Sequence, residues 1–183
     1  TVFDDGATAR GICTIPKNIQ DLLKELSTQS KRYGKARSAS GTLGSGSNSS
    51  VRLALLRIVF KSVGLPEQYS IARFVMWLKN EGIFDAVFNQ VVEKGLSWEE
   101  ELDNFYVAEG LHQALVTQKP NVFSTPENCA KTLTQQYPHV QDISSDEMLS
   151  ALRQALNFDG KFPLTLIVLD EIQQHIGEDS QRS

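Results

Sequence analysis

Apolar residues recur at helical spacing along most of the chain. The first such segment ends before Gly34 and predicts an amphipathic helix over about residues 17–33. Its apolar positions are Ile19, Leu22, Leu23 and Leu26. Residues 50–63 are apolar over much of a helix circumference, which predicts a helix buried between layers. Further helical patterns, each closed by glycine, serine or proline, cover about residues 69–80, 83–93, 97–107 and 110–118.

Two capping signals extend this helical region toward residue 157. Ser124 or Thr125 precedes Pro126, and proline is favoured at the first position of a helix. Ser144 or Ser145 precedes acidic residues, which are favoured in a first turn. We therefore expect residues 51–157 to be predominantly helical.

The segment LTLIVL, residues 164–169, has a different pattern. It is apolar without polar alternation, which is typical of a parallel strand covered on both faces. Residues 35–50 are mostly small and polar and show no apolar period, so we expect a short strand or loop and then a flexible turn, with residues 38–50 mobile. The fold class expected for residues 1–183 is α/β, with a helix, a strand and a Gly/Ser loop in residues 1–50, a helical middle, and a buried strand with its following segment in residues 164–177.

Composition narrows the class of protein. The net charge of -4 argues against a dedicated nucleic-acid coat, because phosphate-binding surfaces show a basic excess. Cys13 and Cys129 lie far apart without zinc-ligand spacing, so reduced thiols in a cytoplasmic protein are expected. No membrane helix and no signal peptide is indicated. The chain opens at Thr1 and stops in a polar run, so we expect a piece of a longer protein.

Two adjacent carboxylates, Asp170 and Glu171, follow the apolar strand. Ligands of open α/β sheets bind beyond the carboxyl ends of the strands. In P-loop ATPases an apolar strand ends on such a pair, known as Walker B: the first acid helps to hold Mg²⁺ and the second can orient the attacking water. We therefore assign Asp170 to a metal site and Glu171 to catalysis. An exposed strand end that happens to be acidic is the alternative.

The phosphate-binding half of such a site is not evident. A P-loop requires G-x-x-x-x-G-K followed by serine or threonine, whose backbone N–H groups and lysine hold the phosphates. Residues 41–48, GTLGSGSN, have the glycine spacing but carry serine in place of lysine. A flexible loop before a helix is the favoured interpretation, and a working P-loop is expected upstream of Thr1.

Two stretches together resemble a known family. GTLGSGSNSSVRLALLRIVFKSVGLPEQYSIARFVMWL and LTLIVLDEIQQHIGEDSQRS resemble the large P-loop ATPases of bacterial BREX-type phage-defence systems, the BrxC/PglY-like proteins. The resemblance implies an AAA+-like module near the amino terminus of a longer chain, with ATP and Mg²⁺ as cofactors. Other defence proteins, DNA and further copies of the chain are the partners that it leaves open. Only Asp170 and Glu171 match a functional motif of the family.

Other polar residues have weaker claims to a function. The basic residues Lys31, Lys35, Arg32 and Arg37 could touch a DNA backbone, although a solvated helix end is the favoured explanation. His112, His139 and His175 show no partner spacing, which favours surface or packing roles. Arg52, Arg57 and Arg73 lie in apolar helices and could contact phosphate, or could pair with carboxylates.

The sequence is also compatible with a second class of function. The helical middle could be a non-enzymatic interaction module that docks partner defence proteins or DNA, with the ATPase fold as scaffold only. An intact P-loop upstream of Thr1 would favour the enzyme.

Overall fold

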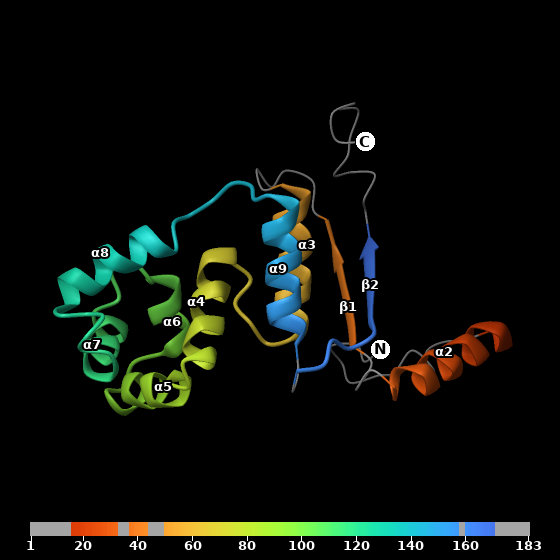
Figure 1. The fold of residues 1–183 in the computed structure, drawn as a ribbon, viewed down its shortest axis with the longest axis horizontal. Coiled ribbons are helices and arrows are strands. Elements are labelled where there is room, and N and C mark those ends of the chain that lie inside the picture. The colour runs from red at the N-terminus through yellow and green to blue at the C-terminus, as the bar shows by residue number, and fades with distance from the viewer. Residues whose placement is uncertain (1–15, 33–36, 44–49, 158–159, 171–183) are drawn as a thin grey trace. The chain divides into compact units, whose positions relative to one another are not determined.

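A computed structural model describes residues 16–32, 37–43, 50–157 and 160–170. The elements, labelled in Figure 1, are α2 (Lys17–Ser30), β1 (Arg37–Thr42), α3 (Val51–Ser62), α4 (Tyr69–Asn80), α5 (Phe84–Glu93), α6 (Trp98–Asp103), α7 (Glu109–Gln118), α8 (Pro126–Gln136), α9 (Ser145–Leu156) and β2 (Thr165–Asp170). The protein is thus mixed α/β and mostly helical, as expected.

The chain divides into two compact units. One comprises residues 1–38 and 156–166, and the other comprises residues 39–155 and 167–183. The first contains α2, and the second contains α3 to α8 and almost all of α9. Both strands begin in the first unit and end in the second.

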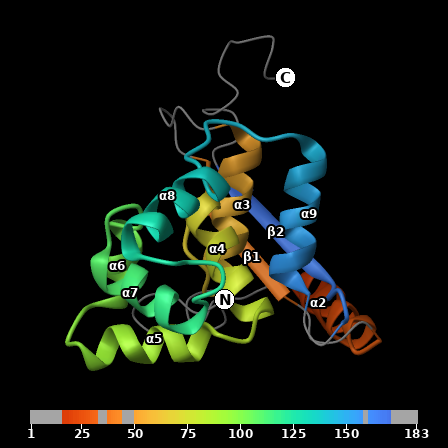
Figure 2. The same ribbon diagram turned by 60° about the vertical axis from the view of Figure 1, so that its left-hand side comes forward.

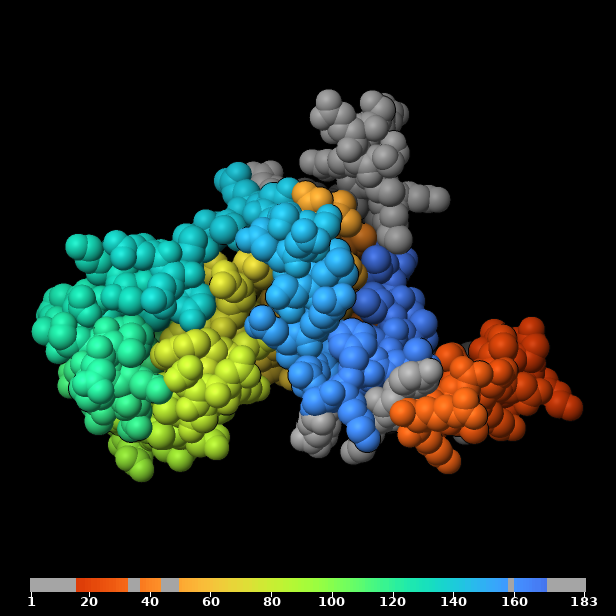
Figure 3. Space-filling view, in the orientation of Figure 1, coloured from red at the N-terminus to blue at the C-terminus, as the bar shows by residue number. Residues whose placement is uncertain are grey.

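Helices α4 to α8, called the helical body from here on, pack around one apolar core. In the space-filling view they form a closely packed mass (Figure 3). Phe74 of α4 is fully buried, and its ring centroid lies 4.8 Å from that of Phe105 and 5.7 Å from that of Tyr137. Leu111 of α7 and Leu133 of α8 are also fully buried in this core. The core therefore lies within the part of the chain that the sequence predicted to be helical.

The helix ends follow the capping signals with one difference. Thr125 is the N-cap of α8, and its side chain accepts a hydrogen bond from the N–H of Asn128. Ser144 and Glu147 form a reciprocal capping box at α9, with Ser144 N–H donating to Glu147 Oε2 over 2.8 Å. The helix expected over residues 97–107 ends at Asp103, because the following residues turn and bury Phe105 in the core.

The two strands pair in parallel. The N–H of Arg37 donates to the carbonyl of Leu164 and the N–H of Leu43 donates to the carbonyl of Asp170, each over 3.0 Å, so the register is constant along the strands. Figures 1 and 2 both show the strands side by side and pointing the same way. Parallel pairing places the carboxyl ends of both strands at one edge.

Helix α3 packs against β1. A side chain at Gly41 would place its Cβ 2.7 Å from Ile58 Cγ1 of α3, so the close approach of helix and strand requires glycine there. Ala39 and Leu43 are each only 2% exposed. The expectation of a mobile segment over residues 38–50 is therefore wrong for residues 38–43, and residues 44–49 lie outside the described residues.

The prediction that residues 164–169 are buried on both faces is also wrong for the described structure. Side chains of β2 alternate between half-buried and exposed, and Leu166 and Val168 are 49% and 52% exposed. The described residues form a sheet of only two strands, and they leave its second face open. An apolar run therefore indicated a strand here without indicating two covered faces.

Helix α2 belongs to the first compact unit. Its apolar residues Ile19, Leu22, Leu23 and Leu26 are all exposed. Over the residues that the structure describes, no helix is long and apolar enough to cross a membrane.

Candidate functional site

The sequence-predicted site begins at the carboxyl edge of the strand pair. Asp170 is the last residue of β2, and its side chain is exposed there. Its backbone carbonyl accepts a hydrogen bond from the N–H of Leu43, the residue that follows β1. The next residue that the structure describes after Leu43 is Ser50, at the start of α3. Glu171, the second predicted acid, lies outside the described residues. The parallel pairing thus brings Asp170 to the edge where open α/β sheets bind ligands.

Hydrogen bonds fix the start of α3, the next described helix along the chain after β1. Ser50 is the N-cap of α3, and its Oγ accepts a hydrogen bond from the N–H of Leu53 over 3.3 Å. The N–H of Ser50 donates to the carbonyl of Gln141, also over 3.3 Å. The first turn of α3 is therefore held by its own cap and by the segment before α9.

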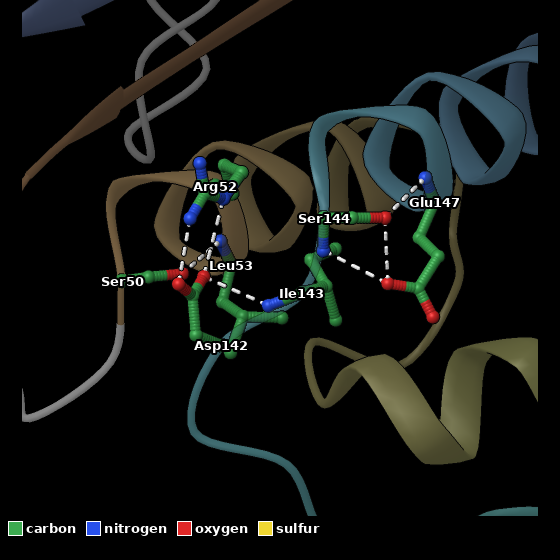
Figure 4. Close-up of polar contacts among 7 residues, drawn as sticks. All are labelled: Ser50, Arg52, Leu53, Asp142, Ile143, Ser144 and Glu147. Carbon is green, nitrogen blue, oxygen red and sulfur yellow. Dashed lines mark hydrogen bonds and ion pairs between the residues drawn. The ribbon is translucent and has the colours of Figure 1, made fainter.

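An ion pair strengthens the same connection (Figure 4). Arg52 Nη2 and Nε lie 2.6 and 3.2 Å from the two carboxylate oxygens of Asp142, in a bidentate geometry. Hydrogen bonding from Arg52, with smaller contributions from Ser50 and the N–H of Ile143, holds the pKa of the Asp142 carboxyl well below its usual range. We call this pair, with Ser50, the α3 clasp.

The α3 clasp was missed by sequence reasoning. Its two charged residues are 90 positions apart, and no local pattern links them. The carboxylate of Asp142 also accepts the N–H of Ile143 over 2.8 Å, a local contact that an aspartate in a turn commonly makes. The sequence could have predicted this local contact of Asp142, but not its ion pair with Arg52.

The three candidate arginines have different surroundings in the structure. Arg52 forms an ion pair with Asp142. The guanidinium of Arg73 lies 5.5 Å from the ring centroid of Tyr69 and 5.8 Å from that of Tyr137, in cation–π contacts. Arg57 is half-buried on α3 and lines a pocket. The expected pairing with a carboxylate is thus confirmed for Arg52.

The histidines and the described cysteine show no catalytic arrangement. His112 is buried, and its Nε2 lies 2.9 Å from the carbonyl oxygen of Phe105, which is a packing role. His139 is exposed, and His175 lies outside the described residues. Burial raises the pKa of the Cys129 thiol to about 12, so this thiol is not a nucleophile at neutral pH.

The structure describes three of the four basic residues near the Gly/Ser segment. Lys31 and Arg32 follow α2 and are exposed, whereas Arg37 is half-buried at the start of β1. Lys35 lies outside the described residues. DNA contact by this group stays a prediction.

The described carboxylates allow one kind of Mg²⁺ coordination at this edge and exclude another. Within the described ranges, no group of three or more histidine, cysteine, aspartate or glutamate side chains could hold a metal ion. Mg²⁺ in nucleotide sites is held by one or two carboxylates, with phosphates and waters completing its shell. A single exposed carboxylate such as Asp170 fits that kind of coordination and does not fit an all-protein metal cage.

Comparisons with known proteins give no family: no family description, no curated protein and no solved structure matches this chain.

Proposed function

We propose that this chain supplies the acidic half of an ATP and Mg²⁺ site in a P-loop ATPase, as part of a longer protein. The supporting observation is the parallel pairing of β1 and β2, which brings Asp170 to the same edge as the end of β1. In this proposal Asp170 contributes to the Mg²⁺ shell, and Glu171 orients the attacking water. Mg²⁺, when bound with ATP, would neutralise charge on the phosphates.

The order of the elements adds support. β1 leads through residues 43–50 into α3, so the strand, the Gly/Ser segment and the helix follow one another as they do around a P-loop. Serine stands where the phosphate-binding lysine is required. We therefore expect the isolated chain neither to bind ATP tightly nor to hydrolyse it, and micromolar ATP affinity in a titration would contradict the half-site proposal.

The biological setting follows from the resemblance of residues 41–78 and 164–183 to BREX-type ATPases. We propose on this ground that the longer protein acts in phage defence in the cytoplasm of a bacterium, with other defence proteins, DNA or further copies of itself as partners. These remain proposals of the same rank as the activity.

The decisive experiment uses the longer protein and two substitutions. Glu171→Gln keeps the side-chain shape and removes the charge, so ATP should still bind while turnover collapses. Asp170→Ala should weaken Mg²⁺-dependent nucleotide binding as well as turnover. Asp103→Asn, an exposed acid at the end of α6, is the matched control and should change neither.

Measured ATP affinity and hydrolysis decide between the two classes of function. Full hydrolysis by the Glu171→Gln protein would remove the catalytic role of that residue. If both variants kept wild-type binding and turnover, the carboxylates would be an acidic strand end. If the unmodified longer protein hydrolyses no ATP, the alternative of an interaction module is favoured, and the exposed apolar residues of α2 support it, because an uncovered apolar stripe is typical of a docking helix.

A further inference from the structure

Arg57 differs from the other two candidate arginines in its surroundings. It projects from a helix whose neighbouring residues are largely buried, and it is itself half-buried. It forms no hydrogen bond and no ion pair with any residue in the part of the chain that the structure describes. A partly desolvated guanidinium without a carboxylate is costly, and a bound anion would offset that cost.

The side chain of Arg57 lines a pocket of about 450 Å³. The pocket lies between α3, the start of α4 and residues 139–141, all within one compact unit. Leu53 and Val140 supply apolar wall, and His139 and Gln68 supply polar groups. A volume of this size is within the range of small-molecule sites.

Hydrogen-bond donors from α4 add to the charge of Arg57. The N-cap Gln68 provides no side-chain cap, and the first backbone bond of α4 runs from the N–H of Ala72 to the carbonyl of Gln68. The N–H groups of Tyr69, Ser70 and Ile71 therefore have no partner in the helix. The hydroxyl of Ser70 donates to the carbonyl of Pro138 and is already used.

One carboxylate also lines the pocket. Glu67 lies 3.3 Å from Lys61 Nζ, so the ion pair partly neutralises its charge. The remaining charged and titratable side chains at the pocket are Arg57, His139 and Tyr69. With Glu67 paired, Arg57 gives the pocket a cationic side next to an apolar wall.

We propose that this pocket binds a small phosphate monoester, with the phosphate on Arg57 and the organic group against Leu53 and Val140. Arginine binds phosphate oxygens in a bidentate geometry, and the N–H groups of Tyr69 and Ser70, two residues that line the pocket at the start of α4, donate to the same anion. The site is separate from the Asp170 edge and does not depend on the ATPase proposal.

The first test uses phenyl phosphate as the probe, without Mg²⁺ or nucleotide. Titration of the ¹⁵N-labelled 183-residue chain should give saturable shifts of the backbone amides of Tyr69 and Ser70, which line the pocket. Inorganic phosphate should shift the same amides with lower affinity, because it lacks the apolar group. Absence of saturable shifts at these amides would overturn the proposal.

Charge variants give effects of opposite sign. Arg57→Gln should weaken binding at least about tenfold, the usual scale for a lost charge-assisted contact. Glu67→Gln should strengthen binding several-fold, because it removes the only carboxylate lining the pocket among the described residues and frees Lys61. Arg153→Gln, an exposed arginine of α9, is the matched control and should leave the affinity unchanged.

Folding of each variant is checked by circular dichroism and by its denaturation midpoint. A folded Arg57→Gln variant that binds phenyl phosphate as tightly as the wild type would overturn the proposal. If Arg57→Gln fails to fold, the Glu67→Gln variant decides: stronger binding supports the site, and unchanged or weaker binding contradicts it. Because ATP and Mg²⁺ are absent, none of these outcomes bears on Asp170.

Discussion

The helical body and the strand pair bury their apolar side chains to different degrees. In the helical body Phe74, Phe105 and Leu111 are at most 1% exposed. In β2, Leu166 and Val168 are about half exposed, although the strand is one of the most apolar stretches of the chain. Apolar side chains are thus removed from water in the helical body and remain about half in contact with water at these positions of β2.

Because of this difference, the residues that stabilise the fold and the residues of the candidate site lie in different regions of the protein. Burial of apolar surface is the main favourable contribution to folding, so the helical body should carry most of the stability of the described residues. The carboxyl edge with Asp170 lies on the strand pair, which relies on α3 on one face and has an open second face. Substitutions at the edge should therefore alter ligand binding with small effects on unfolding.

The largest effect is expected from Phe74→Ala. Removing a fully buried ring that contacts three other aromatic rings should cost about 3–5 kcal/mol of unfolding free energy. Chemical denaturation measures the loss. Phe162→Ala is the control, because that side chain is 52% exposed, and a similar cost for both variants would remove the contrast between the regions.

A second prediction concerns the thiol of Cys129 in the helical body. In a Cys13→Ser background, iodoacetamide at pH 8 should modify Cys129 only as fast as the protein opens, because the thiol is fully buried. Rapid modification of the native protein would show that this core is not closed.

The same thiol gives a pH dependence. Its pKa is about 12 in the folded protein against an ordinary value of 9.0, so the unfolded state ionises first as pH rises. The stability contributed by the neutral thiol is complete below pH 9 and is lost between pH 9 and about 12. The stability of a Cys129→Ala variant should fall less over this range, and equal slopes in denaturation experiments would contradict the assignment.

A smaller effect is expected from the α3 clasp. The pKa of Asp142 is lowered in the folded protein, chiefly by the hydrogen bond from Arg52. Its contribution is therefore complete above the ordinary carboxyl pKa of 3.8 and is lost as pH falls below that value through the folded pKa.

The Asp142→Asn variant tests that dependence. It should have a lower melting temperature than the wild type at pH 7, with a loss well below that of Phe74→Ala, because the pair is partly exposed. The difference should shrink as the solution is acidified below pH 4. A difference that stays constant with pH would show that the substitution acts through packing.

The smallest effect is expected on the open face of β2. Val168→Thr should change the unfolding free energy by no more than about 0.5 kcal/mol, because the side chain is 52% exposed. Ile167→Thr is the matched control on the half-buried face and should cost more. Equal costs would indicate that the outer face is covered in solution.

The sequence determined the local structure of the helical middle. The periodicity predicted a helix over residues 69–80, and α4 has these bounds. The caps at Thr125 and Ser144 were among the predicted alternatives, because side-chain caps involve residues only three positions apart. The strand before Asp170 was also predicted, since apolar β-branched residues favour extended structure.

Tertiary structure alone decided which distant residues meet. The pairing of Arg52 with Asp142, the register of β1 on β2 and the pocket beside Arg57 all join residues far apart in the chain. The open face of β2 could not be read from LTLIVL either, because a strand's residues fix its conformation, whereas burial depends on which elements pack against it. Local patterns therefore determined the elements and the place of Asp170 at the end of its strand, and long-range packing decided the surroundings of the described charged side chains.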